Sequence, residues 1–190
     1  MFSRYIYLLA IIFLTLALLP FAQELSWDRN AIHAGEYWRL FSGHLVHTNL
    51  NHWLMNMITF VLVFSVFYIR NQHPLHWPGV TAVLILIGGI ALLFSSYRNY
   101  VGFSGVIHGL IAYWGLNDLR LKRYLTGSLI VVGLSSKLIA EQLFGGSEQI
   151  TRLIAAPVAI DAHLIFAITG AVLFLVQWLN QANANQQDFD

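Results

Sequence analysis

Long apolar stretches, separated by short polar turns, run through most of this chain. A helix needs about 20 mainly apolar residues to cross a bilayer, or somewhat fewer where it ends inside the protein. Six such runs can be read, at residues 5–22, 50–69, 77–94, 102–116, 124–143 and 159–179. Only 10% of the residues are charged, against about a quarter in soluble domains. We therefore expect an all-α membrane protein built as a bundle of six transmembrane helices.

The apolar runs read as one unit. No shift in composition marks a boundary, so residues 1–190 are expected to form a single domain. Residues 179–190 are polar and are expected to form a disordered tail. The first run is interpreted as an uncleaved span and not as a signal peptide, because the later spans need an anchored partner.

Charge and cysteine content exclude several kinds of protein. The net charge is +1 and no long basic run is present, so a nucleic-acid partner is not expected. The chain has no cysteine, which excludes disulfides, thiolate metal sites and a cysteine nucleophile.

The lysines and arginines of the turns predict an orientation, because cytoplasmic loops carry an excess of them. Arg4, Arg70, Arg120, Lys122 and Arg123 fall on one side of the expected spans, and Arg29, Arg39, Arg98 and Arg152 fall on the other. The tight cluster from Arg120 to Arg123 favours the first side as cytoplasmic. Both termini are then expected in the cytoplasm.

The segment at residues 23–49 is neither an apolar run nor a polar loop. It mixes Trp27, Tyr37, Trp38 and Phe41 with charged residues. Aromatic rings with a polar edge favour the boundary between lipid and water. We expect this segment to lie partly submerged along the outer face.

Three polar clusters stand where the second, fourth and sixth runs begin. The first holds His44, His47, His52 and Asn56, the second Gly102, Ser104, Gly105 and His108, and the third Asp161 and His163. Polar side chains are costly in hydrocarbon and mark functional sites there. These three runs cross in the same direction, so their starts face the same side. The clusters are therefore expected to meet in one site just inside the outer boundary.

Ser104 is the candidate nucleophile of that site. Gly102 and Gly105 permit a tight backbone and a close helix contact. Backbone amides at a helix start can also stabilise a developing oxyanion. The alternative is a packing element in which the serine only bonds a carbonyl one turn back.

His163 is the candidate general base, since an imidazole that reaches Ser104 could take up its proton. A buried, hydrogen-bonded histidine is the alternative. Asp161 lies two residues before His163 and would point to another face of a helix. A Ser–His dyad is therefore favoured over a triad. Lys137 and Glu141 have helical spacing near the outer end of the fifth run and are interpreted as an interfacial ion pair.

His52 and Asn56 are four residues apart and share one face of a helix. Both are donors that could point at an oxyanion. A polar pair that only packs two helices together is the alternative.

The ordered set of these residues resembles the rhomboid family of intramembrane serine proteases. The matching positions are Glu36-Tyr37-Trp38-Arg39, then His47, His52 and Asn56, then Gly102-Phe103-Ser104-Gly105, and finally Ala162-His163. The resemblance implies a six-helix bundle whose fourth helix begins below the surface, in a water-filled cavity open outward. It also implies that Ser104 attacks the scissile carbonyl and His163 takes its proton. His52, Asn56 and the Ser104 amide would form the oxyanion hole, and Trp38 and Arg39 would be structural.

Two departures from the family pattern stand out. His108 occupies a position that commonly holds tyrosine, four residues after the serine. Phe166 and Gly170 stand at the two positions where glycines are usual, and the phenylalanine at the first weakens the expectation of close packing against the fourth helix. With its His108 and its short length, the chain looks most like the rhombosortase branch.

That branch implies a bacterial protein of the inner membrane whose site opens to the periplasm. Its substrates are exported proteins with a C-terminal Gly-Gly motif, a hydrophobic span and a basic tail. The expected partners are thus a transmembrane protein substrate and membrane lipid, and no cofactor or metal is expected.

Three other functions compete with this interpretation. An inactive family member that escorts clients would usually lack the serine or the histidine. A transporter or proton relay would need polar residues along a whole path, yet the inner halves of the runs are nearly all apolar. A zinc hydrolase using His44, His47 and His52 lacks the helical ligand spacing and an accompanying carboxylate.

Overall fold

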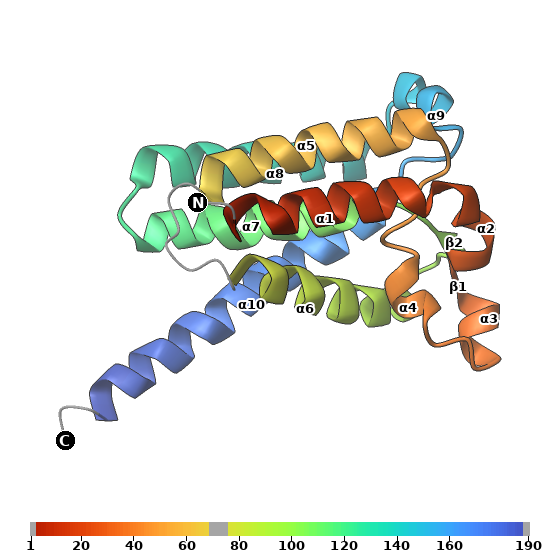
Figure 1. Cartoon of the computed structure of the whole chain (residues 1–190). Helices are drawn as coiled ribbons and strands as arrows, with labels where there is room; N and C mark the ends of the chain where they lie inside the picture. The colour runs from red at the N-terminus through yellow and green to blue at the C-terminus, as the bar shows by residue number, and fades with distance from the viewer. Residues whose placement is uncertain (1–2, 69–75, 188–190) are drawn as a thin grey trace.

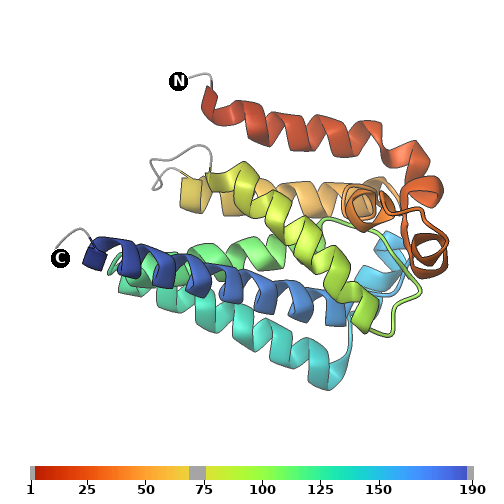
Figure 2. The same cartoon turned by 90° about the horizontal axis from the view of Figure 1, so that it is seen from below.

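All six predicted apolar runs fold as helices in the computed structural model, which describes residues 3–68 and 76–187. These helices are α1 (Ser3–Ala17), α5 (Leu50–Tyr68), α6 (His76–Ala91), α7 (Ser104–Arg120), α8 (Tyr124–Phe144) and α10 (Ile160–Gln187). They pack side by side with α5, α7 and α10 starting at one end of the molecule, as Figures 1 and 2 show.

The expected number of six membrane spans is not confirmed, although several helices could cross a membrane. Within the described residues, four segments are long and apolar enough to cross, namely Leu50–Phe67, Trp77–Phe94, Tyr124–Phe144 and Ile160–Ala184. A fifth is added if Tyr5–Ala17 and Leu19–Leu25, which are bent by 52° at their junction, count as one span. Helix α7 is shorter, at 17 residues, because it begins inside the protein.

Helix α7 forms the centre of the bundle. It contacts α5, α6, α8 and α10, and 12 of its 17 residues are buried. Trp114 of α7 stacks on Trp77 of α6, with ring centroids 5.1 Å apart. α7 is therefore surrounded by protein, whereas its neighbours keep exposed apolar side chains.

Glycines bring α10 directly against α7. A Cβ atom added to Gly170 would overlap the backbone carbonyl of Gly109. Phe166 is fully buried, and its ring fills the space left by Gly88 and Gly105, where an added Cβ would collide with it. The presence of Phe166 weakened the expectation that α10 packs closely against α7. The two helices do pack closely, because small residues on the facing helices accommodate the ring.

Short elements close the end of the bundle at which α5, α7 and α10 begin (Figure 1). They are η1 (Leu19–Phe21), α2 (Ala22–Leu25), β1 (Trp27–Asp28), α3 (Arg29–His33), α4 (Arg39–Ser42), η2 (Leu92–Phe94), β2 (Asn99–Tyr100) and α9 (Glu148–Ile154). β1 pairs antiparallel with β2, so that Trp27 lies opposite Tyr100. The guanidinium of Arg29 donates to the carbonyls of Leu93 at 2.6 Å and Ser95 at 2.7 Å. These bonds anchor the chain that leads into α7.

Both ends of the chain lie at the opposite end of the bundle. The start of α1, the turn between α7 and α8 and the end of α10 are all found there (Figures 1 and 2). Arg70 and the side chain of Arg4 fall outside the described residues. Residues 179–187, which were predicted to belong to a disordered tail, are helical, because α10 continues to Gln187.

Adding a methyl group at the α7–α10 contact tests this packing. Gly170→Ala forces backbone against backbone, so the free energy of unfolding should fall by about 1–3 kcal/mol. Gly133→Ala in α8 is the matched control, because its added Cβ would meet nothing within 4 Å. Reversible denaturation in mixed micelles measures both. Equal stability of Gly170→Ala and the wild type would contradict the close contact.

Candidate active site

Ser104 and His163 meet at the closed end of the bundle. Ser104 is the first residue of α7 and His163 lies in the first turn of α10. The distance from Ser104 Oγ to His163 Nε2 is 3.0 Å. A hydroxyl within hydrogen-bond reach of an imidazole nitrogen is the arrangement that general-base activation requires.

The backbone before Ser104 is held in an extended loop by side-chain hydrogen bonds. Gly102 has φ +123°, a value that side chains other than glycine rarely adopt. The hydroxyl of Tyr100 donates to the Gly102 carbonyl at 2.7 Å and accepts from the Gly105 amide at 3.3 Å. Burial raises the pKa of Tyr100 to about 12, so its phenol keeps its proton and makes both bonds.

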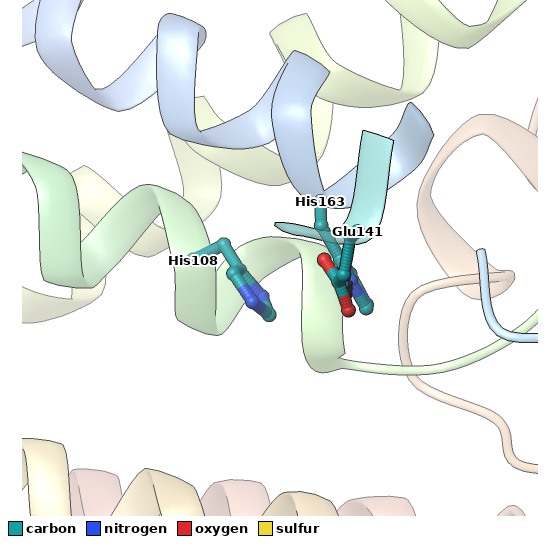
Figure 3. A group of neighbouring side chains, drawn as sticks. All are labelled: His108, Glu141 and His163. Atoms are coloured by element: carbon teal, nitrogen blue, oxygen red, sulfur yellow. Dashed lines mark hydrogen bonds and ion pairs between the residues drawn. The ribbon is translucent and has the colours of Figure 1, made fainter. Parts of the chain in front are cut away.

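Side chains from two helices surround the ring of His163. His108 of α7 stacks on it, with centroids 4.1 Å apart and planes 12° apart, and donates from Nδ1 to the Ser104 carbonyl at 2.7 Å. Glu141 of α8 lies 3.0 Å from His163 Nδ1. Lys137 in turn lies 2.7 Å from the Glu141 carboxylate. Figure 3 shows Glu141 beside the edge of His163 and His108 approaching from α7.

His52 and Asn56 face Gly102 from α5. A Cβ on Gly102 would lie 2.8 Å from His52 Nε2 and 3.7 Å from Asn56 Nδ2. His52 Nδ1 lies 3.0 Å from the Thr48 hydroxyl and 3.5 Å from the Thr48 amide, and the same hydroxyl donates to the Ile154 carbonyl. The Thr48 contact at Nδ1 thus orients the ring so that Nε2 faces the loop before Ser104.

These side chains line one cavity of about 870 Å³. Ser104, His163, His52 and Asn56 are at its polar end, and the cavity continues between α5 and α8 along apolar residues such as Met55, Ile111, Leu129 and Leu134. Its size is typical of sites that enclose a ligand segment. The polar clusters predicted to meet therefore do meet, next to an apolar groove.

The other residues predicted from the sequence support the outer end. Arg39 bonds Glu36 at 2.6 Å and the Ser26 carbonyl at 2.9 Å, so it ties the first-loop segments together. Trp38 is exposed at the start of α4. His47 accepts from the Phe103 amide at 3.4 Å and so links the first loop to the residue before Ser104.

The geometry disfavours a metal ion. His44, His47 and His52 do not converge as ligands; among the described residues, the group of three that comes together is His108, Glu141 and His163, with ligand atoms within 4.8 Å. The two stacked rings direct their nitrogen lone pairs in parallel planes, and these cannot converge on one ion. The ammonium of Lys137, 3.5 Å from His163 Nδ1, also puts a positive charge where a cation would bind.

Sequence reasoning missed two members of this site. Glu141 was interpreted only as the partner of Lys137; that ion pair is present, but the carboxylate also reaches His163. Its position four residues after Lys137, at the outer end of the fifth run, was the available signal. No sequence signal indicated Tyr100.

Comparison with known proteins gives one match. A family model described as Rhomboid domain matches residues 34–180. No curated protein matches the chain. The matched range includes every candidate site residue, from the first loop to α10.

Acid should destabilise the fold through the buried histidines of the first loop. Burial lowers the pKa of His44 and of His47 to about 3, whereas both take up protons near pH 6.5 once unfolded. Their contribution is therefore complete above pH 6.5 and is lost as the pH falls toward 3. In that pH window, each histidine lowers the free energy of unfolding by about 1.4 kcal/mol per pH unit.

Unfolding measured at pH 7 and pH 5 tests this origin. His44→Asn has no titrating group at this position. Between pH 7 and pH 5 its free energy of unfolding should therefore fall by about 2 kcal/mol less than that of the wild type. His33→Asn, on the exposed surface of α3, should show the wild-type loss. An unchanged loss in His44→Asn would contradict this account.

Proposed function

The chain belongs to the rhomboid family, and from that premise we propose that it is an intramembrane serine endopeptidase. Members of this family are generally intramembrane serine proteases, and the apolar helices indicate an integral, multi-pass membrane protein. The observation that carries the proposal is the 3.0 Å contact between Ser104 Oγ and His163 Nε2, inside a cavity with an apolar extension.

In the proposed reaction, Ser104 Oγ attacks the scissile carbonyl while its proton passes to His163 Nε2. The tetrahedral intermediate collapses when His163 returns this proton to the leaving amine. Water then attacks the acyl-enzyme with His163 again as the base, and Ser104 is released with its proton. Each proton taken from an oxygen is given to a departing group, so the cycle closes without a cofactor.

His52, Asn56 and the Ser104 amide are proposed to bind the oxyanion. His52 presents Nε2 and Asn56 presents Nδ2 to the loop before Ser104, and His52 donates there when Nε2 carries a proton. Within the described part of the chain, Asn56 Nδ2 is buried without an acceptor, which is costly in a resting protein. An oxyanion forming between these donors would supply that acceptor.

The proposed substrate is a transmembrane protein cut near the outer face of the membrane. A transmembrane helix hides its amide bonds in internal hydrogen bonds, so it must unwind before a serine can reach one. Glycines favour unwinding. This requirement, with His108 in the place of tyrosine, supports the finer proposal of a rhombosortase that removes C-terminal Gly-Gly sorting tails from exported bacterial proteins.

The proposed location is the bacterial inner membrane, with both termini cytoplasmic and the site open to the periplasm. Arg120, Lys122 and Arg123 lie at or just beyond the end of α7, at the same end of the bundle as both termini (Figure 1). Positive charge collects on the cytoplasmic side. The cavity is at the opposite end, which supports a periplasmic opening.

The alternatives receive less support. An inactive family member has no need for a serine and a histidine in hydrogen-bond contact. A proton relay would continue across the membrane, whereas the polar groups of the cavity gather at one end. A zinc hydrolase that uses His44, His47 and His52 is not favoured, because these three histidines do not gather as a ligand group among the described residues.

Loss of the Ser104 hydroxyl tests the proposal. Membranes containing the wild type should release a tagged reporter that ends in Gly-Gly, an apolar span and a basic tail. Ser104→Ala should release none, because the nucleophile is gone. Ser65→Ala removes a hydroxyl that bonds the Val61 carbonyl on α5 and should cleave normally. Cleavage by Ser104→Ala would refute the assignment, and equal cleavage of a Leu-Leu reporter would refute the Gly-Gly preference.

Removal of an oxyanion donor should slow turnover and leave the fold intact. His52→Ala and Asn56→Ala should each lower kcat by about 100- to 1,000-fold, the typical cost of one lost donor. Ser65→Ala on the same helix removes a hydroxyl that bonds the Val61 carbonyl, does not line the cavity and should leave kcat unchanged. Turnover near that of the wild type in both donor variants would contradict the oxyanion role.

A further inference from the structure

The carboxylate of Glu141 is shared between two partners. One oxygen lies 2.7 Å from Lys137 Nζ and the other lies 3.0 Å from His163 Nδ1. Lys137 and Glu141 are four residues apart on α8, whereas His163 belongs to α10. Both side chains therefore lie at Nδ1 of the imidazole, whereas Nε2 faces Ser104; Figure 3 shows Glu141 next to His163.

This contact selects one tautomer of His163. A carboxylate only accepts hydrogen bonds, so His163 Nδ1 donates to Glu141 at 3.0 Å. The Lys137 ammonium lies farther from Nδ1, at 3.5 Å, and donates to Glu141 at 2.7 Å. The unprotonated nitrogen is then Nε2, 3.0 Å from Ser104 Oγ, where a base is required. In the reverse tautomer, an Nδ1 lone pair would face a carboxylate and Nε2 could accept no proton.

The orientation of the ring is fixed on two sides. Glu141 holds its edge, and the parallel ring of His108 covers its face. The Glu141 side chain is only 15% exposed while that of Lys137 is 45% exposed. The ammonium can therefore stay hydrated while the carboxylate turns inward, where weaker solvent screening strengthens its attraction to an imidazolium.

We propose that Glu141, oriented by Lys137, is a positioning residue that holds His163 in its productive tautomer and stabilises the imidazolium formed during attack. The catalytic unit is then a Ser104–His163–Glu141 triad, where the sequence predicted a Ser–His dyad. This inference rests on the proposed protease function. Glu141 keeps its charge throughout, and the travelling proton moves only between Ser104, His163 and the leaving group.

Kinetics of matched variants provide the first test. In Glu141→Gln, the amide can donate to Nδ1 and so favours the wrong tautomer. We expect kcat to fall about 100-fold, with KM within about twofold of the wild type. Glu141→Asp keeps an acceptor-only carboxylate and should retain more activity than the glutamine variant. Glu148→Gln is the control, since it removes the same charge from an exposed pair with Arg152 and should leave kcat unchanged.

Spectroscopy provides a second test that does not depend on turnover. In 15N-histidine-labelled protein, with His163 assigned from the spectrum of His163→Gln, Nδ1 should be the protonated nitrogen. Glu141→Gln should shift the signal toward protonated Nε2. A wild-type ring protonated on Nε2, or kcat unchanged in Glu141→Gln, would overturn the proposal. If Glu141→Gln does not fold, the wild-type spectrum and Glu141→Asp still decide.

The same experiments separate this inference from the proposed function. If the wild type cleaves no substrate and its Ser104 takes up no fluorophosphonate, the protease assignment fails, even where the spectrum shows the Nδ1 tautomer. If the wild type is active and Glu141→Gln keeps its turnover, the protease assignment stands and the role of Glu141 fails.

Discussion

The structure depends on satisfying the backbone that leads into a helix beginning inside the protein. Hydrocarbon offers no hydrogen bonds, so irregular chain at that depth must find its partners within the protein. The Gly102 amide donates to the Gly43 carbonyl at 3.0 Å, Tyr100 bonds on both sides of Ser104, and His47 accepts from Phe103. The folded first loop thus supplies what water would supply elsewhere, and Ser104 can be held at a polar pocket beside an apolar groove.

Much of this arrangement could be predicted from the sequence. The apolar runs predicted the helices, and the polar clusters at the starts of alternate runs predicted that Ser104, His52 and His163 would share one end. Those inferences need only helix length and direction. The Glu141 contact could not be predicted, because it depends on how α8 is rotated against α10. The packing around Phe166 could not be predicted either, because the small residues that accommodate its ring lie on other helices.

The site divides its work among several helices. α7 supplies the hydroxyl, α10 the imidazole and α5 the donors, while α8 supplies only the carboxylate pair and one wall of the groove. Helix α8 is mostly exposed and packs against α7 and α10. Glu141 of this helix pairs with Lys137 and contacts His163. The helix that borders the groove is thereby coupled to the orientation of the base.

Whether Ser104 is activated by His163 is the central question, and mass spectrometry after fluorophosphonate treatment answers it most directly. The wild type should carry the adduct on the peptide containing Ser104, and His163→Ala should carry almost none while remaining folded. An adduct on another residue, or equal labelling of Ser104 in His163→Ala, would contradict the account.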